Sequence, residues 1–165
     1  MKALGIDPGT ATTGYGILEG EGDDIKLVDY GCIKTSSKEP SSARLKKIFS
    51  DTKKIISKHK PKWIVVERLF FGANTKTAMA VGQARGVILL AASQAGLDIA
   101  EYTPLEVKMA LTGYGRADKN QVQQMVKRIL KLKTIPKPDD ASDALAVALC
   151  HINSEGFNSK VRKAS

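Results

Sequence analysis

Two short apolar segments of the chain each end in an acidic residue, and this pattern constrains the fold more than any other. Lys2 to Asp7 and Trp63 to Glu67 are too short for helices, so both are predicted to be buried β-strands. A carboxylate at the end of a buried strand is costly unless something compensates its charge. We therefore expect the two strands to share one sheet and to bring Asp7 and Glu67 to a common site.

The order of the predicted elements indicates an α/β fold. Strands at 13–18 and 25–34 follow the first strand through short turns, which is typical of an antiparallel meander. A helix over 43–59 then leads to the Trp63 strand, and a right-handed crossover makes that strand parallel to the first. With a fifth strand at 98–102, we expect a five-stranded mixed sheet, three antiparallel strands followed by two parallel ones, flanked by helices.

Four more helices are predicted, and capping residues mark the start of two of them. An Ala-rich helix over 74–95 ends at Gly96, and capping boxes at Thr103–Glu106 and Asp118–Gln121 open the next two. The last helix is expected from about Asp139 to His151, with His151 as a favourable cation at its end. Residues 1–154 would form one domain, and 155–165 a flexible basic C-terminal tail.

The last helix contributes two further acids. Asp140 and Asp143 are three residues apart and share one helix face, beside an apolar arc that would pack on the sheet. Asp139 has no partner at that spacing. Asp140 alone serves equally well as a helix cap, and Asp7 before Pro8-Gly9 as a turn residue. Convergence of all four acids instead predicts a site for a hard divalent cation, Mg²⁺, of the kind that hydrolyses phosphodiesters.

The charge of the chain suits a polyanionic partner. Lys and Arg number 26 against 17 acids, giving a net charge of +9 and a pI near 9.6. The alternative is a solvated surface, of the kind also found in heat-stable proteins. Cys32 and Cys150 are too few for a disulfide framework or a zinc site. No signal peptide or membrane span is predicted, so the cytoplasm is the expected location and no membrane partner is expected.

Two other groups of residues are candidates for DNA contacts. Lys108, Arg116 and Lys119 flank two glycines and could meet a phosphate there, although a flexible loop explains the spacing nearly as well. Phe70, beside Phe71 just after Glu67, could stack on a base or could anchor a buried loop.

Motifs spread along the chain resemble the RuvC family of Holliday-junction resolvases. They are Gly5-Ile6-Asp7-Pro8-Gly9-Thr10, Val66-Glu67-Arg68-Leu69-Phe70-Phe71, the Asn74 to Gly86 segment, Gly113-x-Gly115-x-Ala117-Asp118-Lys119 and Asp140-x-x-Asp143-Ala144-Leu145-Ala146. They cover nearly the whole chain in order, except the extreme C-terminus.

The resemblance implies an RNase H-like nuclease that nicks two opposed strands of four-way junction DNA symmetrically, as a homodimer. It implies two Mg²⁺ ions per active site, with Mn²⁺ as a possible substitute, held by Asp7, Glu67, Asp140 and Asp143. Some relatives carry His at the Asp140 position. Phe70 matches the family's junction-core aromatic residue, Lys108 and Lys119 match its functional lysines, and the 74–95 helix matches its dimer interface. The branch-migration proteins RuvA and RuvB are the implied partners.

Two alternative functions fit parts of the sequence. The Gly5 to Thr10 turn also resembles the phosphate-binding turn of actin-like and sugar-kinase ATP-binding proteins, but those bind nucleotide between two such domains. A binding module that recognises branched DNA without cutting it would use the basic charge and the aromatic residues. Such a module offers no reason to bury four acids.

Overall fold

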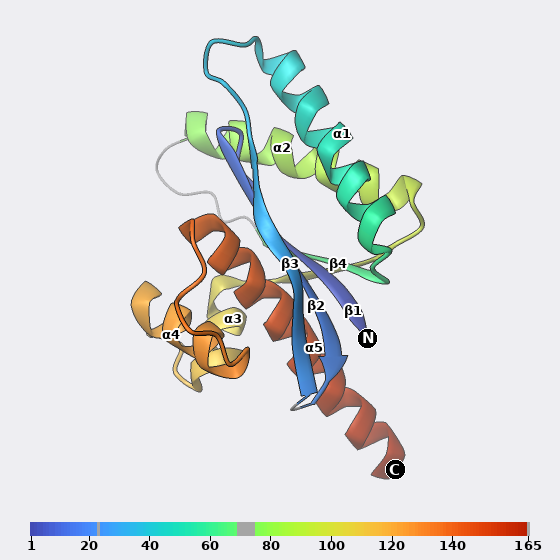
Figure 1. The fold of residues 1–165 in the computed structure, drawn as a ribbon, viewed down its shortest axis with the longest axis vertical. Helices are drawn as coiled ribbons and strands as arrows, with labels where there is room; N and C mark the ends of the chain where they lie inside the picture. Colours follow the sequence, from blue (N-terminus) through green and yellow to red (C-terminus); the bar gives the residue numbers. More distant parts are fainter. Residues whose placement is uncertain (23, 69–74, 165) are drawn as a thin grey trace.

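The computed structural model describes residues 1–22, 24–68 and 75–164, and the fold is a sheet between two groups of helices (Figure 1). Phe70 lies outside the described residues. The elements, in chain order, are β1 (Lys2–Asp7), β2 (Thr12–Glu21), β3 (Asp24–Lys34), α1 (Ser41–His59), β4 (Trp63–Glu67), α2 (Thr75–Gln94), β5 (Asp98–Tyr102), α3 (Pro104–Thr112), α4 (Lys119–Ile129) and α5 (Asp139–Ala164).

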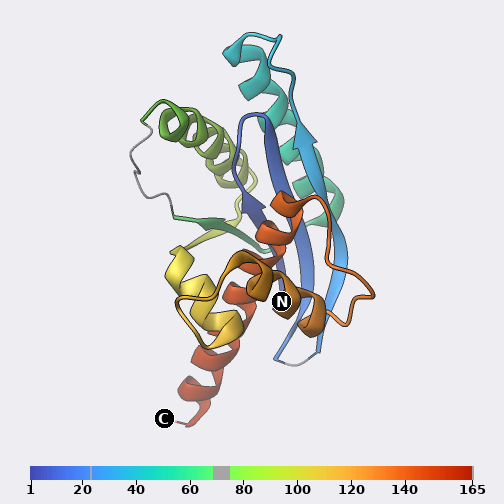
Figure 2. The same ribbon diagram turned by 90° about the vertical axis from the view of Figure 1, so that its left-hand side faces the viewer.

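The predicted sheet topology is confirmed. The strand order is β3-β2-β1-β4-β5, with β1, β2 and β3 antiparallel and with β4 parallel to both β1 and β5. Helices α1 and α2 cover one face of the sheet, and α3, α4 and α5 lie on the other (Figures 1 and 2). The crossover through α1 therefore brings the ends of β1 and β4 together, as the sequence predicted.

Alternation along the strands divides the hydrophobic core into two layers. Leu4 and Ile6 of β1 pack with Ile64 of β4 under α1 and α2. Ala3 and Val65 point to the opposite face and pack with α5. Because neighbouring residues alternate, Asp7 and Glu67 fall on the α5 face of the sheet.

Glycines let α5 lie directly on the sheet. A Cβ atom on Gly5 would lie 2.0 Å from the backbone oxygen of Ala144, and one on Gly14 would lie 2.0 Å from that of Asp140. At Gly16 it would lie 2.5 Å from Leu145 Cδ2. These residues lie on β1 and β2, so only a strand surface without side chains allows this approach.

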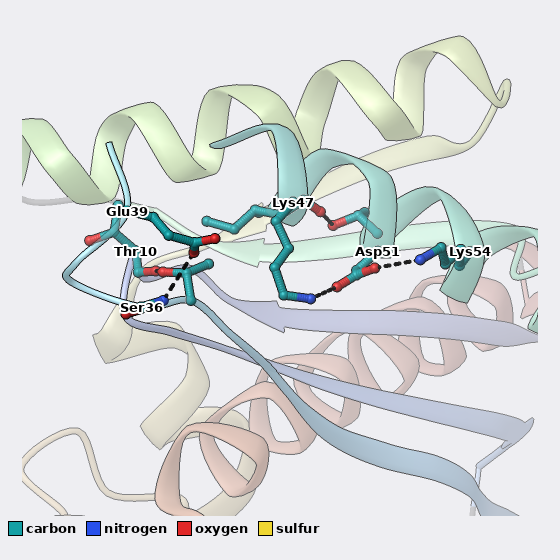
Figure 3. A network of polar contacts seen from close by, with 9 residues as sticks. Thr10, Ser36, Glu39, Lys47, Asp51 and Lys54 are labelled. Atoms are coloured by element: carbon teal, nitrogen blue, oxygen red, sulfur yellow. Dashed lines mark hydrogen bonds and ion pairs between the residues drawn. The ribbon is translucent and has the colours of Figure 1, made fainter. Parts of the chain in front are cut away.

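On the surface, α1 carries ion pairs, and the loop before it contains a hydrogen bond. Asp51 accepts from Lys47 and, at 2.9 Å, from Lys54, all on α1 (Figure 3). The backbone N–H of Ser36 donates to Glu39 at 3.4 Å in the loop before α1. Pairs this exposed add little stability, but they neutralise part of the lysine charge on α1.

The prediction for the end of the last helix is wrong. Helix α5 continues past His151 to Ala164, through most of the segment predicted as a tail. The segment after His151 contains no proline, and Gly156 only weakens a helix without ending it. Whether 155–165 is flexible stays a prediction.

His151 is consequently an interior residue and not a terminal cation. The residue is only 1% exposed. Its ring centroid lies 4.5 Å from that of Trp63, and its Nδ1 is 3.0 Å from the Tyr102 hydroxyl. Burial lowers the pKa of His151, which favours the neutral imidazole.

Both predicted capping boxes are present. Thr103 caps α3 with Glu106 as its reciprocal partner, and Asp118 caps α4 with Gln121. None of the helices in the described residues is long and apolar enough to cross a membrane. The caps fix where α3 and α4 begin, and Lys119 is the first residue of α4.

The close approach of α5 predicts that Gly5→Ala destabilises the fold. The added methyl group would meet backbone atoms of α5, which cannot rotate away, so we expect the free energy of unfolding to fall by about 3 kcal/mol. Chemical denaturation measures this change.

Gly156→Ala, on α5 itself, is the matched control. A Cβ atom there meets nothing closer than the Gly22 nitrogen at 3.9 Å. Alanine is the better helix former, so the control should gain about 0.5–1 kcal/mol. Equal unfolding free energies for the two variants would contradict the packing argument.

Candidate active site

Asp7 and Glu67 end two neighbouring parallel strands. In the register of β1 and β4, Ile6 is opposite Val66, so the next residue on each strand is one of these acids. Parallel neighbours lie about 4.8 Å apart, and the carboxyl ends of such strands are where ligands bind in open α/β sheets. The structure therefore brings these two acids together, as the strand pattern predicted.

The start of α5 brings Asp140 and Asp143 to the same edge. The backbone of Asp140 touches Gly14, and Gly14 lies opposite Asp7 in the β1–β2 pairing. Asp143 follows one turn later on α5. The glycine contact thus determines how close the helix acids come to the strand acids.

One pocket joins elements from both halves of the chain. Its volume is about 210 Å³, and it is open to solvent at one side. Acids, lysines and small apolar residues line it: Asp7, Glu67, Pro104, Val107, Lys108, Lys119, Val122, Asp143, Ala146 and Val147. Opposite charges over an apolar wall give a site that can bind a charged group and exclude part of the surrounding water.

Burial and mutual repulsion hold a proton on the Asp7 carboxyl. Burial is the largest cause, followed by the charges of Asp143, Asp140 and Glu67, and together they raise the pKa of Asp7 to about 7. Lys119 opposes the shift. A carboxylate this costly to ionise is suited to a site that receives a cation.

The pKa values of Glu67 and Asp143 are raised as well. Burial raises the pKa of both, and the Asp143 charge adds to the shift at Glu67. Lys119 Nζ donates to Asp143 Oδ2 at 2.9 Å, which raises the pKa of Lys119 and partly offsets the shift at Asp143. Lys119 is therefore the main cation that balances the acids.

Asp140 and Asp139 have different surroundings. The Asp140 charge acts on Asp7 and Asp143, although Asp140 does not line the pocket itself. Asp139 instead pairs with Lys137 at 2.7 Å and with Lys119 at 3.7 Å, with 46% of its side chain exposed. The Asp139 charge also raises the pKa of Asp143, so Asp140 differs in acting on Asp7 as well. The choice of Asp140 over Asp139 stays a prediction.

Of the predicted DNA-contacting residues, two lie at the pocket. Lys108 of α3 and Lys119 of α4 line it, and the Lys108 charge lowers the pKa of Glu67 against the effect of burial. Arg116 is exposed between α3 and α4 and is not among the lining residues. Phe70 is outside the described residues.

Sequence reasoning missed two features, the apolar wall of the pocket and an ion-paired group outside it. The first is formed by Val107 and Val122; both valines are core positions of α3 and α4, so helical periodicity could have found them. The second is the ion pairing of Glu101 on β5 with Arg85 of α2 and, at 3.9 Å, with Arg68. Arg68 directly follows Glu67, but no sequence spacing links it to Glu101.

The donor set fits a hard divalent cation. Within the described residues, no three His, Cys, Asp or Glu side chains are arranged as a ready-made cage. Mg²⁺ does not need one, because it keeps several waters and binds through one or two carboxylates together with substrate phosphates. Carboxylates that raise one another's pKa would gain from such a cation.

The chain matches one family of known proteins over most of its length. The RuvC family, described as "Crossover junction endodeoxyribonuclease RuvC", matches residues 3–151. Proteins of that name from Halothermothrix orenii and Caldicellulosiruptor saccharolyticus are 57% and 56% identical, over 97% and 93% of this chain and the same shares of theirs.

Solved structures give the same result. The chain is similar to the Thermus thermophilus RuvC structure, with a TM-score of 0.89, 37% identity and coverage of 96% of this chain and 97% of that one. T. thermophilus RuvC in complex with Holliday junction substrate gives a TM-score of 0.92, with 36% identity and coverage of 96% of each chain. The five-stranded mixed sheet with its flanking helices is thus the expected RNase H-like fold, and the chain belongs to the RuvC family of crossover junction endodeoxyribonucleases, the nucleases that resolve Holliday junctions.

Proposed function

We propose that this endonuclease cuts four-way DNA junctions by paired symmetric nicks, in a Mg²⁺-dependent reaction at the Asp7–Glu67 pocket. The observation that carries the proposal is the convergence of Asp7, Glu67 and Asp143 on one pocket with Lys108 and Lys119. Divalent-metal dependence in general accompanies membership of this nuclease family. The choice of Mg²⁺ follows from the all-carboxylate donors, since oxygen ligands suit hard cations.

In this proposal Asp7, Glu67, Asp140 and Asp143 hold the metal, with two ions per site and Mn²⁺ as a substitute. Bound ions of this kind supply an activated water and stabilise the leaving oxygen of a phosphodiester. The four acids come from β1, β4 and α5, so the rigid sheet and helix orient them. The apolar wall of Val107 and Val122 limits water around the scissile phosphate.

The cations have distinct proposed roles. Lys119 lies at the pocket edge with 55% of its side chain exposed, so it can turn from Asp143 toward a substrate phosphate. There it would stabilise charge that develops during cleavage. Lys108 faces the same pocket from α3. Arg116 is exposed and is proposed only as a contact to the DNA backbone.

Two proposals rest on the family resemblance more than on the pocket. Phe70 would enter the junction core and stack on a base. The implied homodimer would use α2, and support comes from one exposed stripe of that helix at helical spacing: Met79, Gln83, Gly86 and Leu90. RuvA and RuvB are the proposed branch-migration partners.

Membership of an endonuclease family decides against the ATP-binding protein and against the non-cleaving module. The cytoplasm is the proposed location. Both cysteines are free, which is consistent with a reducing compartment.

Asp7→Asn should abolish junction cleavage. The amide is close to isosteric with the carboxyl, but it cannot carry the charge that binds the metal, so we expect a rate loss of at least about 10³-fold, with the four-way junction still bound. Asp51→Asn is the control, because Asp51 is an acid paired with lysines on the surface of α1. Cleavage of a synthetic junction with Mg²⁺ measures both, and undiminished cleavage by Asp7→Asn would remove Asp7 from the site.

Stability without metal should fall as the pH rises toward 7. The folded protein keeps a proton on Asp7 up to about pH 7, whereas the unfolded chain releases it near 3.8. Between these values the folded state binds more protons, so the free energy of unfolding decreases with increasing pH.

At pH 8 with chelator, Asp7→Asn should therefore be more stable than the wild type, by on the order of 2 kcal/mol. The difference should shrink at pH 4, where the Asp7 carboxyl is protonated in the folded protein, and Mg²⁺ should restore wild-type stability at pH 8. Denaturation at both pH values tests this. The same stability difference between the variant and the wild type at pH 4 and at pH 8 would contradict this prediction.

Lys119→Gln should slow cleavage more than it weakens binding. Loss of charge stabilisation at the transition state predicts a decrease of about 10²-fold in single-turnover rate, with a change of only a few-fold in Kd. Lys54→Gln is the matched control, because Lys54 also pairs with an aspartate at 2.9 Å but lies on α1. Lost affinity with an unchanged rate would reassign Lys119 to phosphate anchoring.

A further inference from the structure

One stretch of the chain beside the pocket carries cations and no acids. Residues 119–138 are 20 residues long and contain six Lys or Arg and no Asp or Glu. They form α4 and the segment that returns from α4 to α5. The whole chain has a net charge of +9, so this short stretch holds a large part of the positive excess.

The charges on this stretch gather at two open hollows. One lies between β3 and the returning segment, and the other at the C-terminal end of α4. Gln124 and Lys127 line both hollows. The other lining residues are Tyr30, Lys133, Thr134, Ile135 and Lys137 in the first, and Met125, Arg128, Lys131 and Leu132 in the second. Among the residues that the structure describes, no acid lines either hollow.

Most of these cations are available to a ligand. In residues 1–22, 24–68 and 75–164, no carboxylate lies within ion-pairing distance of Lys127, Arg128, Lys131 or Lys133. Lys137 differs, because Asp139 holds it at 2.7 Å. On α1, by contrast, Asp51 engages two lysines (Figure 3). Unpaired cations on one surface create a field that attracts polyanions.

Several uncharged residues on and beside this surface have side chains that donate hydrogen bonds. Asn120 and Gln124 of α4 are exposed and lie in line with Lys127 at helical spacing. Thr134 and Tyr30 add hydroxyl groups at the first hollow. Lys, Arg, Asn, Gln, Thr and Tyr side chains are the usual contacts to DNA phosphates.

The surface continues directly from the candidate active site. Lys119 begins α4 and contacts Asp143, and Lys137 precedes α5 and contacts Asp139. From Lys119 to Ile129, α4 is 11 residues long. At 1.5 Å per residue this is about 16 Å, or about five base pairs of duplex at 3.4 Å each. A duplex leaving the pocket along α4 would meet these cations within one half-turn.

We propose that Gln124, Lys127, Arg128, Lys131 and Lys133, the α4 basic surface, bind the phosphate backbone of the junction arm that leaves the active site. The inference rests on the proposed function, since it takes the substrate at the pocket to be duplex DNA. Contacts of this kind read no sequence and fix the direction of the arm. The surface thereby selects how the scissile strand enters the pocket.

The test replaces three exposed cations of the surface, Arg128, Lys131 and Lys133, with Gln. The control replaces three exposed lysines of α1 or its C-terminus, Lys46, Lys53 and Lys60, which makes the same change in net charge. Each set also contains one residue with a left-handed backbone conformation, since φ is 53° at Lys131 and 49° at Lys60. Helix α1 lies on the sheet face opposite α4 (Figures 1 and 2).

Binding to a four-way junction is measured by fluorescence anisotropy at several salt concentrations, without divalent cation. Each lost phosphate contact lowers the slope of log Kobs against log salt by about 0.9, so the α4 variant should lose about 2–3 in slope. Between about 50 and 200 mM salt, the binding constant of the wild type should therefore fall by a factor about 40 times larger than that of the α4 variant. The α1 variant should keep the wild-type slope.

Hydroxyl-radical footprinting of the same complexes gives a second readout. Wild type should protect the arm for about five base pairs beyond the pocket, and the α4 variant should leave that stretch unprotected. Equal slopes for wild type and the α4 variant, with an unchanged footprint, would overturn the proposal and leave an acidic protein as the candidate partner. An equal loss in both variants would also overturn it, since total charge would then explain the effect. Because neither readout involves cleavage, failure here is distinguishable from failure of the active-site assignment.

Discussion

The whole structure depends on the contact between α5 and a glycine-lined strip of β1 and β2. At Gly5 and Gly14 the backbone of the helix lies where a side chain would otherwise stand. This contact closes one layer of the core, and it also carries the start of α5 to the carboxyl end of β1. Stability and the position of the acids therefore have a single cause. A helix held off by ordinary side chains would still cover the sheet, but its aspartates would lie farther from Asp7.

The acid group acts against the stability that this packing provides. Burial and like charges raise the pKa of Asp7, Glu67 and Asp143, so ionising them together costs free energy of folding. Lys119 offsets part of the cost through Asp143, but it is more than half exposed and serves several acids. A divalent cation bound among these carboxylates would relieve their mutual repulsion. Such relief is expected in a metal-dependent nuclease.

Much of this arrangement could be predicted from the sequence because it depends on local patterns. The short apolar runs before Asp7 and Glu67 predicted the strands and their adjacency, and the capping boxes at Thr103 and Asp118 predicted where α3 and α4 begin. What could not be predicted depends on long-range packing. His151 has the sequence context of a helix end, yet it is buried against Trp63 because α5 continues. The pairing of Arg68 and Arg85 with Glu101 joins the residue after β4, helix α2 and strand β5, which no sequence spacing connects.

The distribution of charge completes the connection between fold and substrate. A net charge of +9 could be spread evenly, and on α1 acids do interrupt the lysines. Over residues 119–138 no acid does so. The stretch begins at Lys119, which contacts Asp143 of the pocket, and Lys137 near its end contacts Asp139, outside the pocket. In the proposed function the acids would hold the metal, while the surrounding cations would attract the DNA substrate. The acids repel DNA and the cations repel a metal ion, so the two groups must be separate but adjacent. The turn from α4 back to α5 provides that separation.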